Sequence, residues 1–294
     1  MIGKMIGRNL KLYFRDRMAV FFSLLSVLIV IVLYILFLSS LQVDDVKAQL
    51  GGAVEEDDIS YLINSWILAG LLSITCVTST LGAFGSFVND REKKLTMDFK
   101  SSPISYGAYP VASAAAAFIV GTVISLITFA IYTAYIYIDS GYMFSQDEVI
   151  KCIGMILISV LMSSTLMGFM VTFFATNSAF SSASLIIGTI IGFLNAVYVP
   201  MGSLPDQIQT VLNCLPFGHI AALFRQILMV DSIDACFDGA PEDMIEGYKE
   251  TYAVELSWDG SDIEPSTSFI FIGAVFAAAL LLMFFNYSRK RNEL

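Results

Sequence analysis

The sequence predicts an all-α membrane protein with six transmembrane helices, an N-terminal interfacial helix and an outer pair of re-entrant helices before the last span. Two observations support this class. Of the 294 residues, 56% are apolar and only 14% are charged, whereas soluble chains carry roughly 25% charged residues. So many apolar side chains have no room inside a soluble domain, and the mean hydropathy of +0.74 excludes a disordered chain. The net charge of −10 argues against nucleic-acid binding.

Stretches without Asp, Glu, Lys or Arg locate the spans. The longest, from Cys152 to Pro205, exceeds one helix, because a span needs about 20 residues. A polar turn from Thr176 to Ser182 divides it in two. We therefore predict six transmembrane helices at 19–41, 62–88, 108–138, 152–175, 180–200 and 267–287.

The charges on the connecting segments predict the orientation. An even number of spans puts both termini on one side, and the segments on that side hold 12 of the 16 basic residues but 5 of the 26 acidic ones. Segments rich in Lys and Arg stay in the cytoplasm. We therefore expect a multi-pass protein of the cytoplasmic membrane, with both termini in the cytoplasm.

Residues 1–17 form a separate amphipathic segment. At about 100° per residue, basic side chains share one narrow stripe and apolar ones the opposite face. The basic residues are Lys4, Arg8, Lys11 and Arg15, and the apolar ones are Ile2, Met5, Ile6, Leu10 and Tyr13. Such a helix lies in the membrane interface with its basic edge on anionic headgroups. A topology anchor and a mechanical element both fit this pattern.

Residues 89–105, between the second and third spans, combine charges with a helical stripe. The stripe consists of Val88, Glu92, Leu95 and Phe99. Pro103 disfavours helix at the residue before it and ends the segment. We expect a short rigid helix tied at both ends to spans, and the pattern alone favours a positive-inside loop that rests on the membrane. A helix that docks in a groove of a partner protein is the alternative.

Residues 206–230 are apolar enough to compete for a seventh span. They contain Pro216, His219 and Arg225, however, and ionisable side chains are costly in lipid. A crossing here would also place the basic C-terminus outside. We therefore predict two short helices that meet near Pro216 and dip into the membrane from outside.

The segment 231–264 carries 11 acidic side chains and one Lys, which predicts a solvated acidic cap on the outer side. A calcium site around Asp234 and Asp238 is the weaker alternative, because the alternating D-x-D-x-D-G pattern is missing. Of the four cysteines, Cys214 and Cys236 fall on this side. We expect free thiols, and a disulfide between these two is the alternative.

Catalytic and energy-coupling motifs are missing from the sequence. The single histidine excludes an H-E-x-x-H zinc site, and no G-x-S-x-G motif occurs. No acid lies inside a predicted span, which argues against an intramembrane aspartyl protease and an ion-coupled carrier. Without G-x-x-x-x-G-K-[ST], the chain has no P-loop for ATP. We expect neither enzymatic activity nor a metal or cofactor on this chain, and an energy source on another polypeptide.

Two segments resemble a known family. They read Asp90-Arg91-Glu92 … Asp98-Phe99 … Ser102-Pro103-Ile104-Ser105 and Leu215-Pro216-Phe217-Gly218-His219-Ile220 … Leu223-Phe224-Arg225. Together with the six-span layout, they resemble the membrane-spanning permease of type-2 ABC exporters. The first segment is similar to that family's coupling-helix region, and the second to its Pro-led helix after the fifth span. One departure is Lys94-Leu95, which stands where a Gly-Thr pair often follows the triplet.

The resemblance implies a single permease domain over residues 1–294, paired with an identical or related second copy and with two ATPase subunits that hold ATP and Mg²⁺. Substrates would be small amphiphiles, drugs, lipids or peptides moved outward. A self-sufficient channel or secondary carrier and a non-transporting scaffold or immunity protein are the alternatives. The implied coupling residues are Asp90, Arg91, Glu92, Leu95, Asp98, Phe99, Pro103 and Ile104, and those of the re-entrant region are Pro216, Phe217, His219 and Arg225.

Overall fold

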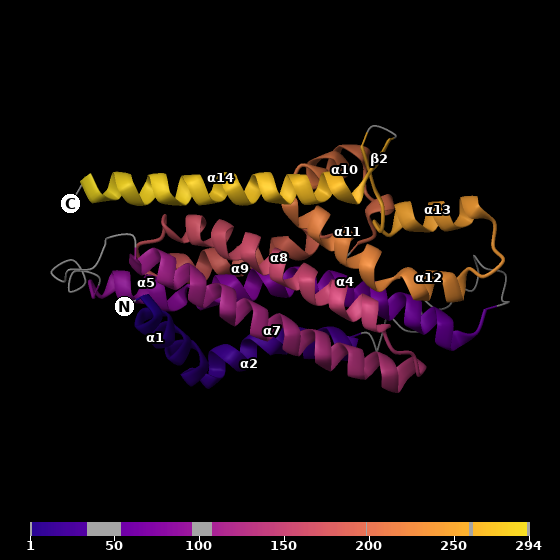
Figure 1. The fold of residues 1–294 in the computed structure, drawn as a ribbon, viewed down its shortest axis with the longest axis horizontal. Coiled ribbons are helices and arrows are strands. Elements are labelled where there is room, and N and C mark those ends of the chain that lie inside the picture. The colour runs from indigo at the N-terminus through magenta and orange to yellow at the C-terminus, as the bar shows by residue number, and fades with distance from the viewer. Residues whose placement is uncertain (1, 34–53, 96–107, 198, 259–260, 293–294) are drawn as a thin grey trace.

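The computed structural model describes residues 2–33, 54–95, 108–197, 199–258 and 261–292. The long helices lie side by side along one axis, and shorter helices gather toward one end (Figure 1). In chain order the elements are α1 (Ile2–Arg15), α2 (Arg17–Leu33), α4 (Glu56–Ala83), α5 (Gly85–Glu92), α7 (Ala108–Ser140), α8 (Gln146–Val171), α9 (Asn177–Leu194), the 3-10 turn η2 (Met201–Ser203), α10 (Asp206–Asn213), α11 (Pro216–Leu228), α12 (Val230–Cys236), α13 (Glu242–Thr251), β1 (Leu256–Trp258), β2 (Ser261–Ile263) and α14 (Pro265–Asn292). The predicted all-α membrane class is confirmed.

Five helical spans in the described part of the chain are long and apolar enough to cross a membrane. They correspond to the second through sixth predicted spans, and their bounds are Glu56–Glu92, Ala108–Ser140, Gln146–Val171, Asn177–Leu194 and Pro265–Asn286. The first predicted span, 19–41, is helical in α2 up to Leu33. Its remaining residues lie outside the described ranges.

Helix α4 is the central element of the bundle. Its first turn carries Glu56, Asp57 and Asp58 close to the positive end of the helix dipole, which stabilises that end. Most of its other side chains are buried against α7, α8 and α11. Tyr61 and Trp66 contribute large apolar surfaces to this core.

Small residues bring the central helices close together. A Cβ placed on Gly121 of α7 would lie 2.6 Å from Cγ2 of Thr80 and 2.8 Å from Cγ1 of Val160. Both neighbours are β-branched and stiff at χ1, so they have little freedom to move away. Gly121 therefore sets the distance between α7, α4 and α8, as small residues do where membrane helices pack.

The predicted N-terminal helix forms as α1 and ends beside Asp16. The Asp16 carboxylate accepts a hydrogen bond of 3.1 Å from the amide of Met18, which caps the start of α2. Asp16 thus separates α1 from the first apolar helix. This is the separation that the sequence predicts near residue 17.

The predicted pair of short helices after the fifth span also forms. Residues Gln207–Asn213 and Pro216–Leu228 meet at an angle of 84°. Pro216 occupies the first turn of α11, where its missing N–H costs no helix hydrogen bond. After α12 and α13, a short antiparallel hairpin pairs Leu256 with Ile263 and leads into α14.

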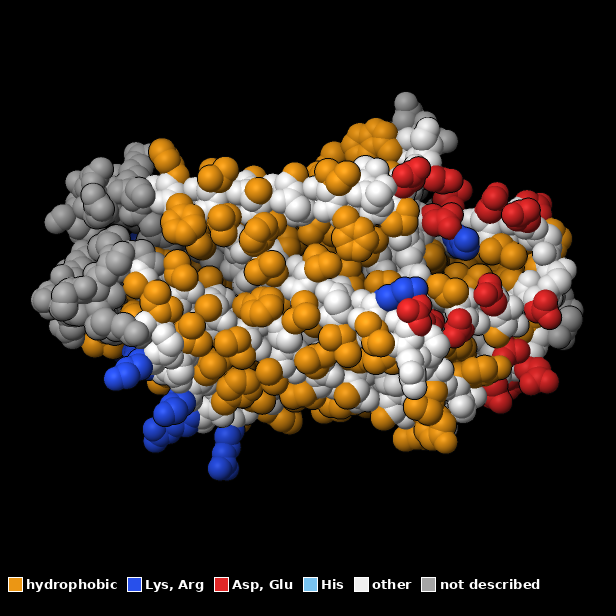
Figure 2. Space-filling model, in the orientation of Figure 1, with side chains coloured by type: hydrophobic (Ala, Val, Ile, Leu, Met, Phe, Trp, Pro, Cys, Tyr) orange, Lys and Arg blue, Asp and Glu red, His pale blue; other side chains and the backbone are white. Residues whose placement is uncertain are grey.

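The surface divides into three zones along the long axis. Figure 2 shows apolar side chains over the middle, acidic side chains gathered at the end that carries α12 and α13, and basic side chains projecting at the end that carries α1. An apolar middle between two charged ends is the surface expected of a membrane-spanning bundle.

Candidate functional site

The best-connected polar cluster lies at the end of the molecule where α1, α5 and α7 meet. Asp90 of α5 is buried, with 2% of its surface exposed. Its carboxylate accepts two hydrogen bonds from the Arg8 guanidinium, at 2.6 and 2.9 Å, and a third from the Tyr109 hydroxyl at 2.7 Å. The bonds with the carboxylate raise the pKa of Arg8. Three helices, α1, α5 and α7, are thus joined through one carboxylate.

A second polar contact reinforces the docking of α1. The Asn9 amide donates to the Ser113 hydroxyl of α7 at 3.3 Å. Asn9 lies between the buried Met5 and Tyr13 on one helical face, and this face packs on the protein. The predicted apolar face is therefore correct for Met5 and Tyr13, but Ile2 is exposed.

The basic stripe of α1 is divided between two environments. Lys4, Lys11 and Arg15 are exposed, as expected for an edge that meets headgroups. Arg8 instead turns to Asp90. The placement of Arg8 departs from the prediction because a buried carboxylate within reach is a stronger partner for a guanidinium than a screened headgroup.

The two residues after Asp90 bind the turn between α8 and α9. Arg91 donates to the carbonyl oxygens of Thr172 and Phe174 at 2.8 and 3.1 Å, close to the end of α8. Glu92 accepts a bond of 2.5 Å from the Asn177 amide at the start of α9. In addition, Asn286 of α14 donates to the Thr172 hydroxyl at 2.6 Å. The triplet therefore links α5 to α8 and α9 directly, and to α14 through Thr172.

The helix that contains the triplet ends earlier than predicted. Helix α5 stops at Glu92, and Lys94 has a φ of 56°, in the left-handed region. The amide of Leu95 then donates a hydrogen bond of 2.9 Å to the carbonyl of Asp90. The expected helical stripe is wrong at Leu95 for this reason, because the helical conformation ends before it. Four further predicted residues lie outside the described ranges: Asp98, Phe99, Pro103 and Ile104.

At the opposite end, the residues of the bent pair α10–α11 serve structural roles. His219 is buried, with Nε2 2.9 Å from the Asn213 carbonyl and Nδ1 2.9 Å from the Ser268 hydroxyl. Since a carbonyl only accepts, Nε2 carries the hydrogen and Nδ1 accepts from Ser268 in the neutral ring. Phe217 packs against the apolar core. The single histidine thus joins α10, α11 and α14.

Arg225 of α11 is 1% exposed and holds the end of α9. Its guanidinium donates to the carbonyls of Asn195 and Ala196 at 2.9 and 3.0 Å and to that of Ala253 at 3.2 Å. It also lies over the Trp66 ring, 5.2 Å from the centroid. Arg225 donates to carbonyls that would otherwise accept from the amides of a further helical turn. This explains why α9 ends at Leu194 and not near 200 as predicted.

The acidic segment contains no cluster of three or more His, Cys, Asp or Glu side chains placed to hold a metal ion, within the residues described. All four cysteines are free thiols, and only Cys214 is exposed. Burial raises the pKa of the Cys236 thiol to about 12. The expected free thiols are confirmed.

Sequence reasoning identified Arg8, Asp90 and Glu92 separately but missed one partner of each. These partners are Asn9 for Arg8, Tyr109 for Asp90 and Asn177 for Glu92. Asn9 had a detectable signal, because it is a polar residue on the same helical face as Met5 and Tyr13. Nothing in the local pattern distinguishes Tyr109 or Asn177.

These features define a multi-pass all-α membrane protein. Membrane-length helices surround α4, an N-terminal helix is bonded to the end of the α4–α5 span, and a bent helix pair precedes α14. The sequence profile of the ABC-2 family transporter protein matches residues 52–287. The chain belongs to this family and is a permease, the membrane-spanning transport subunit that works with an ABC ATPase. No curated protein matches the sequence.

Proposed function

We propose that this permease moves a small amphiphile, drug, lipid or peptide outward across the cytoplasmic membrane, driven by two ATPase subunits. The observation that carries the proposal is the bonding of α5. Asp90 holds α1 and α7, Arg91 holds the end of α8, and Glu92 holds the start of α9. A displacement of α5 therefore reaches four other helices through short, charge-assisted hydrogen bonds.

The end of α5 offers an ATPase a place to bind. The side chains of Glu92, Lys93, Lys94 and Leu95 are all exposed, whereas Asp90 is buried. The predicted coupling residues thereby fall into two groups, those that contact the ATPase and those that transmit its movement. The exposed tip contacts the ATPase, together with the predicted residues Asp98, Phe99, Pro103 and Ile104, and the inward-facing residues transmit the movement.

Helix α9 supplies the face for a second permease copy. Only 17% of the residues of α9 are buried. The exposed residues on one side of the helix include Ser178, Ser182, Leu185 and Thr189. Membrane helices associate through such small and hydroxylated residues more readily than through large apolar ones. A second copy that packs here would enclose a path with mild polarity for an amphiphile.

The separation of charge supports cytoplasmic termini. Basic side chains project beside α1, and acidic ones gather over α12 and α13 at the other end (Figure 2). The positive-inside rule places the basic end, and with it the tip of α5, on the side where ATP is hydrolysed. In this orientation the bent pair α10–α11 lies at the outer side.

The test is purification of the native complex from membranes, followed by reconstitution in liposomes. We expect a retained subunit that hydrolyses ATP, and hydrolysis that a transported amphiphile stimulates. Glu92→Ala and Phe99→Ala should reduce the stimulation. The matched control is Glu242→Ala, an exposed acid in the first turn of α13 at the opposite end, which should leave it unchanged.

Two results would overturn the proposal. One is a purified chain that never retains an ATPase and conducts solute in liposomes under a gradient alone. The other is a complex whose ATP hydrolysis and transport are identical in the Glu92→Ala, Phe99→Ala and Glu242→Ala variants.

A further inference from the structure

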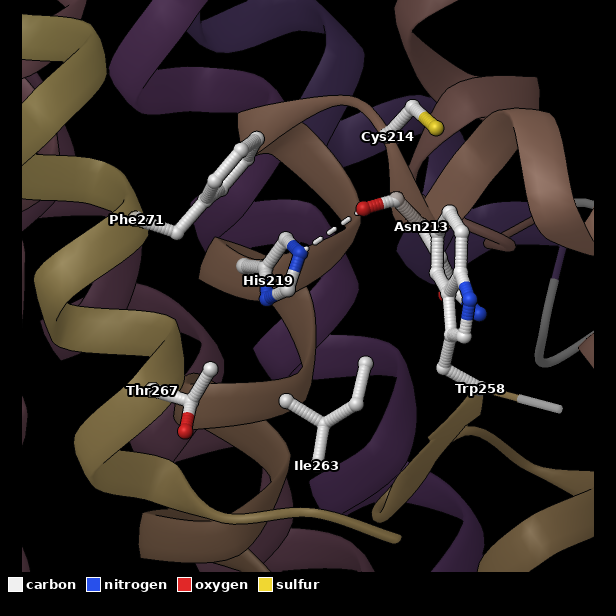
Figure 3. Close-up of a pocket in the computed structure, with 7 residues that line it drawn as sticks. All are labelled: Asn213, Cys214, His219, Trp258, Ile263, Thr267 and Phe271. Carbon is white, nitrogen blue, oxygen red and sulfur yellow. Dashed lines mark hydrogen bonds between the residues drawn. The ribbon is translucent and has the colours of Figure 1, made fainter. Parts of the chain in front are cut away.

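A cavity of about 450 Å³ opens between the α10–α11 turn, the β1–β2 hairpin and the first turns of α14. Figure 3 shows Cys214 and Asn213 from the turn, Trp258 and Ile263 from the hairpin, and Phe271 from α14 around a central His219. The volume falls within the range of about 300–1,000 Å³ that small-molecule pockets occupy. The coupling cluster of α1, α5 and α7 shares no residue with it.

The lining of the cavity is apolar and carries no ionised side chain. Trp258, Ile263 and Phe271 are its large apolar side chains, and the Phe271 ring centroid lies 4.7 Å from that of His219. The polar atoms of His219 are already satisfied by Asn213 and Ser268. Such a lining accepts a hydrocarbon chain or a ring system and rejects a buried charge.

Charged and apolar side chains adjoin the cavity without lining it. Asp262 and Glu264 are exposed next to Ile263 in sequence, at the edge of the acidic outer segment, and on β2 the Asp262 side chain lies on the face opposite Ile263. Ile270 of α14, next to the lining residue Phe271, is 73% exposed. A ligand with a positive head is therefore attracted by the nearby acidic edge, while only its apolar body enters the cavity.

Trp258 adds a second preference for a positive head. Its indole is 45% exposed, so one part lines the cavity while another faces outward. Indole rings attract ammonium groups through their π-electrons, and the attraction is strongest for Trp. The exposed indole and the two carboxylates therefore favour the same sign of charge.

We propose that this cavity binds a single-chain cationic amphiphile, with the chain against Phe271 and the ammonium group near Trp258 and the acidic edge. This deepens the proposed function by naming a substrate class, and it rests on that function only for the claim that the ligand is cargo. Binding itself requires no ATPase.

Cys214 provides a direct test, because it lines the cavity and the other three thiols are buried. The full chain in nanodiscs is treated with N-ethylmaleimide, a neutral reagent whose local concentration surface charge does not alter. The probes are dodecyltrimethylammonium, dodecyl sulfate and 1-dodecanoylglycerol, below the concentrations that disrupt the discs. At ten times its Kd, the cation should slow labelling of Cys214 roughly tenfold, because only the unoccupied fraction reacts.

Two variants test the location of the ligand. Thr267→Phe places a ring in the cavity, and Ile270→Phe adds a ring one turn further along α14, outside the lining. Each labelling rate is compared with that of the same variant without ligand. Thr267→Phe should abolish protection, and Ile270→Phe should retain it.

The charge preference is tested separately with the Asp262→Asn/Glu264→Gln double variant, which should reduce protection by the cation severalfold and leave the neutral amphiphile unaffected. Equal protection by dodecyl sulfate, protection that survives Thr267→Phe, or no protection by any probe would overturn the inference. If the native complex still showed substrate-stimulated ATP hydrolysis, only the binding site would be wrong. Conversely, selective protection without a retained ATPase would preserve the site and remove the export function.

Discussion

Arg8 and Asp90 form a two-point ion pair between α1 and α5, with Nη1–Oδ2 and Nη2–Oδ1 distances of 2.6 and 2.9 Å. The carboxylate side is almost fully buried, and the guanidinium side is partly exposed. The pair fixes the N-terminal helix to the end of the α4–α5 span, 82 positions away in the sequence. The N-terminal helix is therefore a bonded part of the bundle.

Substitution of Arg8 should release α1. Arg8→Lys keeps the charge but loses the planar fork that matches the carboxylate, and Arg8→Ala removes two of the three bonds that Asp90 accepts from Arg8 and Tyr109. We expect a loss of about 1 kcal/mol for Arg8→Lys, as for an ordinary hydrogen bond, and about 2 kcal/mol for Arg8→Ala, as for hydrogen bonds to a charged group. Hydrogen exchange of the α1 amides should accelerate about 5–30-fold in Arg8→Ala. Lys4→Ala, on the exposed edge, is the control, and equal exchange in both alanine variants would contradict the docking role.

Packing at Gly121 gives a second prediction. Gly121→Ala should destabilise the bundle by about 1–3 kcal/mol, because the new methyl group overlaps Thr80 and Val160. At Gly154 of α8, a Cβ would meet no heavy atom within 4 Å, so Gly154→Ala should be neutral or stabilising by up to about 1 kcal/mol. The free energy of unfolding in mixed micelles measures the effect of both variants. Equal stability of the two variants would show that α7 has room to shift.

Arg225 gives a third prediction. Arg225→Lys should cost about 2–3 kcal/mol, because one ammonium group cannot replace a fork that reaches three carbonyls from two segments. The control is Lys151→Met, whose exposed pair with Asp147 contributes little to stability because solvent screens it. The same unfolding measurement applies. A loss in Arg225→Lys no larger than in the control would mean that water satisfies these carbonyls.

A fourth prediction concerns Lys94, whose backbone adopts a conformation that favours glycine. Its φ of 56° places a non-glycine residue in the left-handed region, at a cost of roughly 1–2 kcal/mol. Lys94→Gly should therefore stabilise the end of α5, by up to about 1 kcal/mol after the greater entropy of the unfolded chain is counted. Lys93→Gly, at φ −79°, should not. Amide exchange of residues 92–95 measures the effect, and faster exchange in Lys94→Gly would refute it.

The sequence was sufficient for the apolar helices because charges are costly in lipid, and segments without charges therefore stand out. It was also sufficient for the break before α2 and for the bend at Pro216. The pairing of Arg8 with Asp90 was not predictable, since helical periodicity describes one segment and contains nothing about partners 82 positions away. The same holds for Arg225 and the end of α9.

Helix ends were the weakest sequence predictions, for a specific reason. Stop signals in sequence are chiefly Gly, Asn and Pro. Here the chain leaves α5 and α9 through Lys94 and Ala196, which have φ values of 56° and 49°. Contacts with the rest of the fold hold such residues in the left-handed conformation. One example is the hydrogen bond from Arg225 to the Ala196 carbonyl. Neither residue type marks a helix end.

The orientation provides the last prediction, and it underlies the coupling proposal. Single cysteines at Lys4 and Glu242, each in a Cys214→Ser background, place reporters on exposed positions at the two charged ends. A membrane-impermeant maleimide added to intact cells should label Glu242→Cys at once and Lys4→Cys only after permeabilisation, because the basic end stays in the cytoplasm. The three remaining native thiols are buried and provide a low background. Immediate labelling of Lys4→Cys would place α1 and the tip of α5 outside, where no ATPase could bind them.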